Sequence, residues 1–293
     1  MKLKISILLF ASLILAACEK PSEVELIPPG SEEIEISAVS EADTNVATAQ
    51  VDSGGILPSD HRRFAGRLTI TKVTYDAPTQ VQTIAFSRVI LEDRLRPVQI
   101  LGRTFGYHGF NLGQVMLNNG EMLRIPHRVQ LGRQVGDPTV VAGFEYVADL
   151  TTTYNAEQQY TWTIASPDSV NPFSPSIQTP ADLTVQYPRG GAIISRNEDL
   201  TLRWRGRGNI IIVISGYDPI ARRTRPFLNI RPRANNGRAV IGSKFLKLLP
   251  TRFQYYTFTF ILANRDESVV VGRFQSPVLV QAACVYNSFV ELR

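Results

Sequence analysis

Arginine is the residue type whose spacing in this chain suggests a specific binding chemistry. Three arginines alternate along one strand-like segment and three more follow shortly after it: Arg203, Arg205 and Arg207, then Arg222, Arg223 and Arg225. The planar guanidinium group donates paired hydrogen bonds that match carboxylates and phosphates. If the two segments are neighbouring strands, they form a basic stripe that binds polyanions. The alternative is a solvated sheet face whose charges prevent edge-to-edge aggregation.

The other titratable residues offer little for catalysis. His61, His108 and His127 have no second His or Cys at metal-ligand spacing. The chain contains no Gly-x-Ser-x-Gly nucleophile motif and no phosphate-binding glycine loop with its lysine. Its acids do not pair convincingly for glycoside hydrolysis. We therefore predict no enzymatic activity, no metal and no cofactor.

The N-terminus has the pattern of a secretory signal. Lys2 and Lys4 precede a 13-residue apolar run, 5–17, which only two serines interrupt. A signal peptide has an apolar region of roughly 7–15 residues. At about 1.5 Å of rise per residue, such a run is too short to cross a ~30 Å hydrocarbon core as a helix. We expect this segment to direct export.

The four residues that end this segment, Leu15-Ala16-Ala17-Cys18, resemble the lipobox of bacterial lipoproteins. The resemblance implies that residues 1–17 are removed, and that Cys18 carries a diacylglyceryl thioether and usually an N-acyl chain, of which palmitate is typical. Two or more acyl chains give stable anchoring. Glu19 after the cysteine favours the outer membrane. The expected location is therefore the bacterial cell envelope, on the periplasmic or the surface side.

Cys284 is the only other cysteine. If Cys18 carries lipid, Cys284 has no intramolecular disulfide partner. One interpretation is a small buried hydrophobic residue. The other is an intermolecular disulfide or a reactive thiol.

Charge divides the chain into two parts. Residues 19–60 contain ten acidic residues, one lysine and no aromatic residue, whereas residues 61–293 contain 28 basic and 16 acidic residues. Low hydrophobicity with high net charge cannot offset the chain entropy of folding. We predict that 18–60 comprises the lipidated cysteine and a disordered acidic linker. An Ile-Glu-Ile alternation within it leaves open that a short piece pairs with an edge strand.

The remaining chain is predicted to be all-β. Val, Ile, Thr, Tyr and Phe recur in short runs separated by turn residues, at the strand density of a β-sandwich. We predict sandwich domains at 61–166 and 183–293, joined by a Pro/Ser-rich linker at 167–182. Trp204 is expected to face the core, and Asn118-Asn119-Gly120 to form a hairpin turn.

The second half resembles the immunoglobulin/fibronectin-like repeats of bacterial surface proteins. The residues that carry the resemblance are Tyr187-Pro188, Gly190-Gly191, Leu200-Thr-Leu-Arg-Trp204, Asn236-Gly237, Leu248-Leu249-Pro250 and Tyr256-Thr-Phe258. This resemblance implies a sandwich and no particular ligand. For the chain as a whole we predict two immunoglobulin/fibronectin-like β-sandwich domains after the signal peptide and the disordered linker.

Together these features predict a membrane-anchored envelope lipoprotein that binds or scaffolds without catalysis. Its expected partner is an envelope protein or an acidic glycan, and not nucleic acid. One alternative is a glycan-binding surface module in which Trp162, Tyr107 or Tyr217 stacks on sugar. Another is an accessory component of an envelope hydrolase, which a pocket holding His108 or His127 beside an acid would support.

Overall fold

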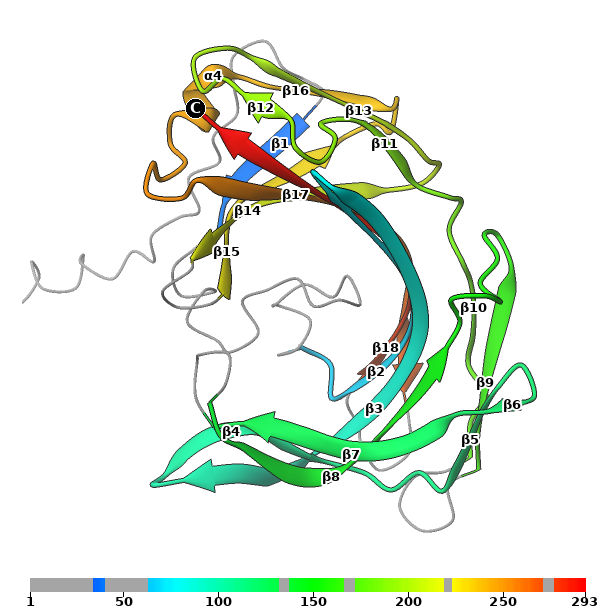
Figure 1. The fold of residues 1–293 in the computed structure, drawn as a ribbon. Helices are drawn as coiled ribbons and strands as arrows, with labels where there is room; N and C mark the ends of the chain where they lie inside the picture. The colour runs from blue at the N-terminus through cyan, green and yellow to red at the C-terminus, as the bar shows by residue number, and fades with distance from the viewer. Residues whose placement is uncertain (1–33, 40–62, 132–136, 166–171, 219–222, 271–276) are drawn as a thin grey trace, which may run out of the picture.

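One large curved sheet runs through the whole molecule in the computed structural model (Figure 1). The structure describes residues 34–39, 63–131, 137–165, 172–218, 223–270 and 277–293. Ten strands follow one another in this sheet, and an eleventh, β12 (Ile193–Ile194), pairs with β18. In spatial order the ten are β1 (Ile34–Ala38), β15 (Arg223–Pro232), β14 (Ile210–Asp218), β17 (Tyr255–Val270), β18 (Pro277–Leu292), β2 (Gly66–Ala77), β3 (Gln80–Ile100), β4 (Arg103–Gly109), β8 (Thr139–Asp149) and β7 (Leu123–Gln130).

Two small sheets pack against the outer side of the large sheet (Figure 1). The first has four strands in the order β10 (Ser176–Gln178), β9 (Gln159–Ala165), β5 (Gln114–Leu117) and β6 (Gly120–Glu121). The second has three strands in the order β11 (Thr184–Tyr187), β13 (Leu200–Arg205) and β16 (Arg238–Ile241). The short helix α4 (Ser243–Leu246) follows β16. The all-β prediction is therefore confirmed.

The central strand β18 explains how one sheet supports two cores. Its side chains alternate between faces with period two. Val278, Val280 and Ala282 belong to the core beneath the four-stranded sheet, whereas Tyr286 and Val290 belong to the core beneath the three-stranded sheet. All five lie at even positions and so point to the same side. At odd positions, Ala283 and Val285 join a third apolar cluster on the opposite face.

The strand pairing does not separate the two predicted domain ranges. β18 from the second range runs parallel to β2 from the first, with a register from Val278↔Gly66 to Ser288↔Asp76. The same two ranges do supply most of the two separate cores. The chain therefore has two sandwich-like cores that share one sheet. Within the described part of the predicted linker at 167–182, Ser176–Gln178 forms strand β10, which pairs with β9.

The predicted linker at 18–60 needs one correction. Ile34–Ala38 forms the edge strand β1, which pairs antiparallel with β15. Ile34 and Ile36 are buried in the core beneath the three-stranded sheet. Burial of these two alternating isoleucines stabilises a segment whose acidic composition alone predicted disorder. The signal segment 1–17, Cys18 and the linker residues 19–33 and 40–60 lie outside the described residues.

Several local predictions are confirmed. Trp204 is buried, and its indole Nε1 donates a hydrogen bond to Asn235 Oδ1 at 2.8 Å. Asn118 and Asn119 have φ values of 46° and 69° in the turn between β5 and β6. Cys284 is a free, buried cysteine, which supports the first of its two interpretations. Its Sγ lies 3.1 Å from Tyr154 Oη, and burial raises the pKa of the thiol.

Candidate functional site

The arginines predicted to form one stripe lie on different sheets. Arg203 and Arg205 alternate with buried Leu202 and Trp204 on β13, so both point outward from the three-stranded sheet. Arg207 is also exposed, just beyond the end of β13. β13 pairs with β11 and β16, whereas β15, which carries Arg223 and Arg225, pairs with β1 and β14. Arg222 lies outside the described residues. The two arginine groups therefore do not occupy neighbouring strands.

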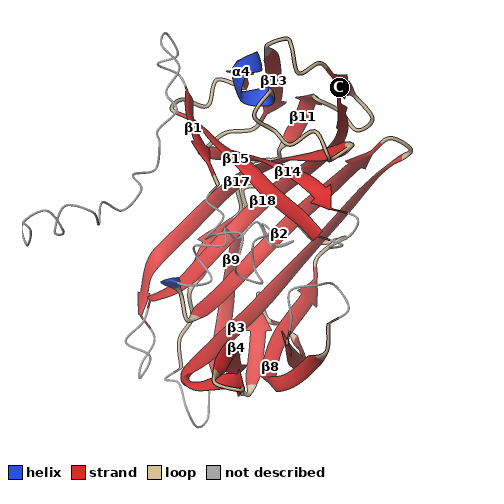
Figure 2. Cartoon of the chain, turned by 90° about the vertical axis from the view of Figure 1, so that its left-hand side faces the viewer, coloured by secondary structure: helices blue, strands red, loops and turns tan. Residues whose placement is uncertain are grey.

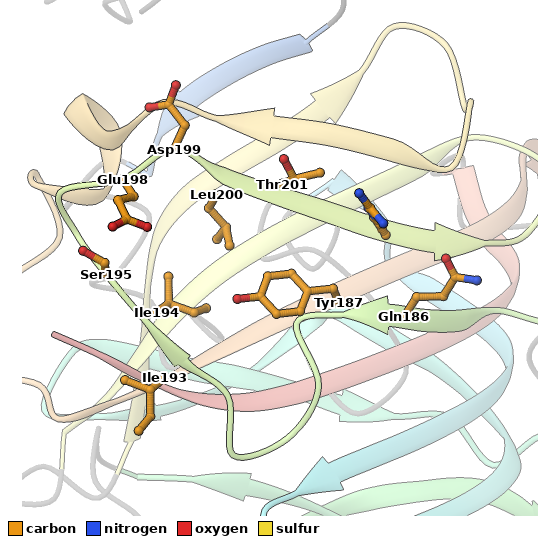
Figure 3. A pocket seen from close by; sticks show the side chains of 10 residues that line it. Gln186, Tyr187, Ile193, Ile194, Ser195, Glu198, Asp199, Leu200 and Thr201 are labelled. Carbon is orange, nitrogen blue, oxygen red and sulfur yellow. The ribbon is translucent and has the colours of Figure 1, made fainter.

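Arg203 instead lines a pocket of about 590 Å³ on the outer face of the three-stranded sheet (Figure 3). The pocket lies where β11, β12 and the start of β13 approach each other. The residues that line it are Gln186, Tyr187, Ile193, Ile194, Ser195, Glu198, Asp199, Leu200, Thr201 and Arg203. Ile194 and Leu200 are buried and anchor this wall to the core. The floor of the pocket is therefore part of the rigid sandwich.

Tyr187 is the aromatic residue of this pocket. It is the last residue of β11, it pairs with Arg203 across the β11–β13 ladder, and it is 37% exposed. Figure 3 shows its ring beside Ile194 and below Thr201. An aromatic ring with an accessible face offers a flat apolar surface next to polar groups.

The charged side chains of the pocket differ in whether they have a hydrogen-bond partner within the protein. Asp199 Oδ1 accepts a hydrogen bond from the backbone N–H of Ser243 at 2.7 Å, which ties β13 to the start of α4. Glu198 and Arg203 are exposed, and neither side chain has a hydrogen-bond or ion-pair partner among the described residues. The pocket thus presents one free carboxylate, one free guanidinium group and the amide of Gln186.

The loop after Tyr187 is fixed to the other half of the molecule. Arg189 Nε donates to Asp76 Oδ2 at 2.7 Å, and Tyr286 Oη donates to the same oxygen at 2.8 Å. Burial, together with the neighbouring Asp76 carboxylate, raises the pKa of Tyr286 to about 12. A Cβ at Gly190 would lie 2.3 Å from the Asp76 carbonyl oxygen, so only glycine allows this close approach. These contacts hold the backbone next to Tyr187 in one position.

The aromatic residues predicted to stack on sugar lie on other strands than Tyr187 does. Trp162 is fully buried, and its Nε1 donates to Ser87 Oγ at 3.1 Å, so the expectation of a Trp162 platform is wrong. Tyr107 is half-buried on β4, and the side chain of Tyr217 lies outside the described residues. Sequence reasoning missed Tyr187 as a site residue, because its exposure depends on the pairing register between β11 and β13.

His127 lies beside an acid, but not in this pocket. Glu145 Oε2 accepts hydrogen bonds from Arg88 Nη2 at 2.5 Å and Arg88 Nε at 3.1 Å, and lies 3.4 Å from His127 Nδ1. Burial alone raises the pKa of Glu145, but His127 and Arg88 outweigh it and hold the pKa below its usual range. His127 and Glu145 are both nearly buried, and none of the three residues lines the pocket. This cluster joins β3, β7 and β8 as a structural ion pair.

Within the described ranges, no three His, Cys, Asp or Glu side chains group as metal ligands. In the same part of the chain, no helix has the length and apolar character needed to cross a bilayer. No protein-family model matches the chain, and no curated protein matches it.

Proposed function

We propose that this protein is a non-catalytic binding protein of the bacterial cell envelope, anchored by lipid on Cys18. Two features support the proposal. Leu15-Ala16-Ala17-Cys18 has the residues that lipoprotein processing requires. The Tyr187 pocket combines a free cation, a free anion and an aromatic ring on a wall fixed to the core. This pocket is the observation that carries the binding role, because such unpaired groups serve recognition and contribute little to folding.

Acylation is tested on the mature protein from a bacterial host. Mass spectrometry of the N-terminal peptide is expected to show Cys18 as the first residue, with added acyl mass, and a Cys18→Ala variant is expected to leave the membrane fraction. An unmodified residue 18 in the mature chain would contradict the anchor. The same variant, purified without lipid, remains suitable for ligand binding, so the anchor and the pocket are tested separately.

The second candidate function is glycan binding through the Tyr187 pocket. Sugar rings stack their apolar face on aromatic side chains, while their hydroxyls need both hydrogen-bond donors and acceptors. Tyr187 supplies the ring, Glu198 an acceptor, and Gln186 and Arg203 donors. Arg203 is also suited to a sugar carboxylate, in agreement with the acidic glycan predicted from the sequence. An outer-membrane location remains part of this proposal.

A glycan array screened with the mature protein tests this candidate. Tyr187→Ala is expected to weaken binding about ten-fold, because removal of a central aromatic anchor costs more than about 1 kcal/mol. Tyr187→Phe keeps the ring and should bind nearly as wild type. Arg205→Gln is the matched control for Arg203→Gln, because both arginines are exposed on β13 but only Arg203 lines the pocket. Equal binding by wild type and Tyr187→Ala would exclude this pocket as the glycan site.

A further inference from the structure

The β3–β4 hairpin lies toward the end of the molecule opposite β11 and β13 (Figure 2). β2 pairs with β3 only as far as Leu91, and the later part of β3 continues beyond it to pair with β4. Ile100 pairs with Arg103, so Leu101 and Gly102 form a two-residue turn. Leu101 is fully exposed and Ile100 is 41% exposed.

Leu101 occupies a backbone conformation that leucine disfavours. Its φ is 50°, and Gly102 follows with a φ of 76°, as in the two-residue turns that favour Asn-Gly. A left-handed conformation costs a non-glycine residue roughly 1–2 kcal/mol. Full exposure also leaves the leucine side chain without compensating burial. The turn therefore carries a residue that does not serve the folding of the isolated chain, which points to contact with something outside it.

The outer part of the hairpin is basic in sequence. Arg94, Arg96 and Arg103 lie in the hairpin, and the sequence contains no Asp or Glu between Asp93 and Glu121. Arg96 and Arg103 are exposed, and the Arg103 guanidinium carbon lies 5.2 Å from the centre of the Phe105 ring. Leu95, next to Arg96, is a third exposed apolar side chain of the hairpin. An apolar tip whose two strands carry exposed arginines matches the interface of an anionic lipid layer, where acyl chains accept the apolar groups and headgroup phosphates the cations.

The hairpin is held rigidly enough to present this tip. Val98 packs with Val129 and Ala142 in a small buried cluster, and Phe105 lies against it. Val98 and Phe105 come from the two strands of the hairpin, whereas Val129 and Ala142 come from β7 and β8. The neighbouring hairpin thus supports the extended part of β3 and β4 on one side. The tip residues lie beyond this contact.

We propose that the β3–β4 hairpin inserts Ile100 and Leu101 into the interface of an anionic membrane, with Arg96 and Arg103 on the headgroup phosphates. This contact orients the folded body on the membrane surface, and it requires neither the lipid on Cys18 nor the Tyr187 pocket.

The test uses residues 19–293, which lack the signal, Cys18 and its lipid but keep every described residue. Sedimentation with phosphatidylcholine vesicles, with and without phosphatidylglycerol, measures partitioning. We expect binding only to the anionic vesicles, with loss at high salt. Leu101→Asn, which suits the turn, should weaken binding about ten-fold through lost apolar burial. Arg96→Gln and Arg103→Gln should each weaken it about five-fold, as expected for one basic residue near an anionic surface.

Leu248→Asn is the matched control, because Leu248 is 63% exposed but follows α4 at the other end of the molecule. It should bind as wild type does. Circular dichroism and urea unfolding confirm that each variant is folded. The proposal is overturned if the anionic vesicles bind no better than neutral ones, or if Leu101→Asn binds as tightly as wild type. Either result would leave the proposed anchor and pocket untouched, because neither depends on the tip.

Discussion

The two ends of the large sheet are supported by very different amounts of apolar packing. At one end, the three-stranded sheet covers a large core that includes Trp204, Phe258 and Phe260. At the other, the described residues of the β3–β4 and β7–β8 hairpins share a small cluster of three buried side chains: Val98, Val129 and Ala142. The pocket lies over the large core and presents polar groups, whereas the β3–β4 tip extends beyond the small cluster and presents apolar groups.

This contrast shows how one all-β scaffold can separate two kinds of surface. A pocket with directional hydrogen-bonding groups needs a fixed wall, because small displacements weaken its contacts. An apolar tip that enters a lipid interface needs exposure more than fixed geometry. The following variants test the comparison, beginning with the largest expected effect.

Trp204→Ala should destabilise the protein most. It removes a buried aromatic side chain that packs 6.0 Å from Phe260 between ring centroids, and it leaves Asn235 without its indole donor. We expect a loss of about 3–5 kcal/mol in the free energy of unfolding, measured by urea denaturation. Val98→Ala in the small cluster should cost about 1.5 kcal/mol, corresponding to two buried methyl groups. Equal losses for the two variants would contradict the proposed difference between the ends.

Asp76→Ala should have the next largest effect, because this carboxylate joins the two halves of the molecule. Its side chain is 5% exposed and accepts hydrogen bonds from Arg189 and from buried Tyr286. Loss of a buried acceptor leaves the tyrosine hydroxyl unpaired, at a cost of about 2–3 kcal/mol. Amide hydrogen exchange should increase in the loop after Tyr187. Asp182→Ala is the control, because Asp182 is exposed where it pairs with Lys72. Unchanged exchange would show that Asp76 does not position the pocket.

Glu145→Gln should reveal a pH-dependent contribution at the base of the β3–β4 hairpin. The folded-state pKa of Glu145 is lowered, so its ionised form stabilises the protein above its ordinary pKa of 4.5, and the gain is lost as pH falls through the lowered value. We expect Glu145→Gln to cost about 1 kcal/mol near neutral pH, because Arg88 is partly solvated. The difference from wild type should shrink in acid. A difference that stays constant down to the acid transition would contradict this assignment.

Leu101→Asn should have the smallest effect and the opposite sign. Asparagine tolerates a positive φ better than leucine does, so the variant should gain about 0.5–1 kcal/mol in the free energy of unfolding. Thermal denaturation measures the gain. Leu248→Asn is the control, because it replaces an exposed leucine whose φ is not positive. A loss of stability would mean that Leu101 contributes to the fold of the isolated chain.

Local patterns predicted individual strands well, because each depends on neighbouring residues. Leu200, Leu202 and Trp204 alternate and are all buried, and Asn118-Asn119 adopts the positive φ values that its turn requires. The candidate site was less predictable. The alternation with Trp204 predicts that Arg203 points outward, but its pocket partner Tyr187 comes from a different strand, β11. The edge strand β1 is hard to predict from its acidic segment, because its two isoleucines become stabilising only when β15 and the core are present.

The sequence by itself determined the all-β class, the inward face of β13, the outward arginines beside it and the lipobox-like residues around Cys18. These are local properties, fixed by side-chain periodicity and by short motifs. Only the tertiary structure decided that β18 and β2 join both halves in one sheet, that Tyr187 and Arg203 share a pocket, and that Arg203 and Arg225 lie on different sheets. The physical reason is that strand partners far apart in sequence are selected by the burial of whole faces, which no single segment encodes.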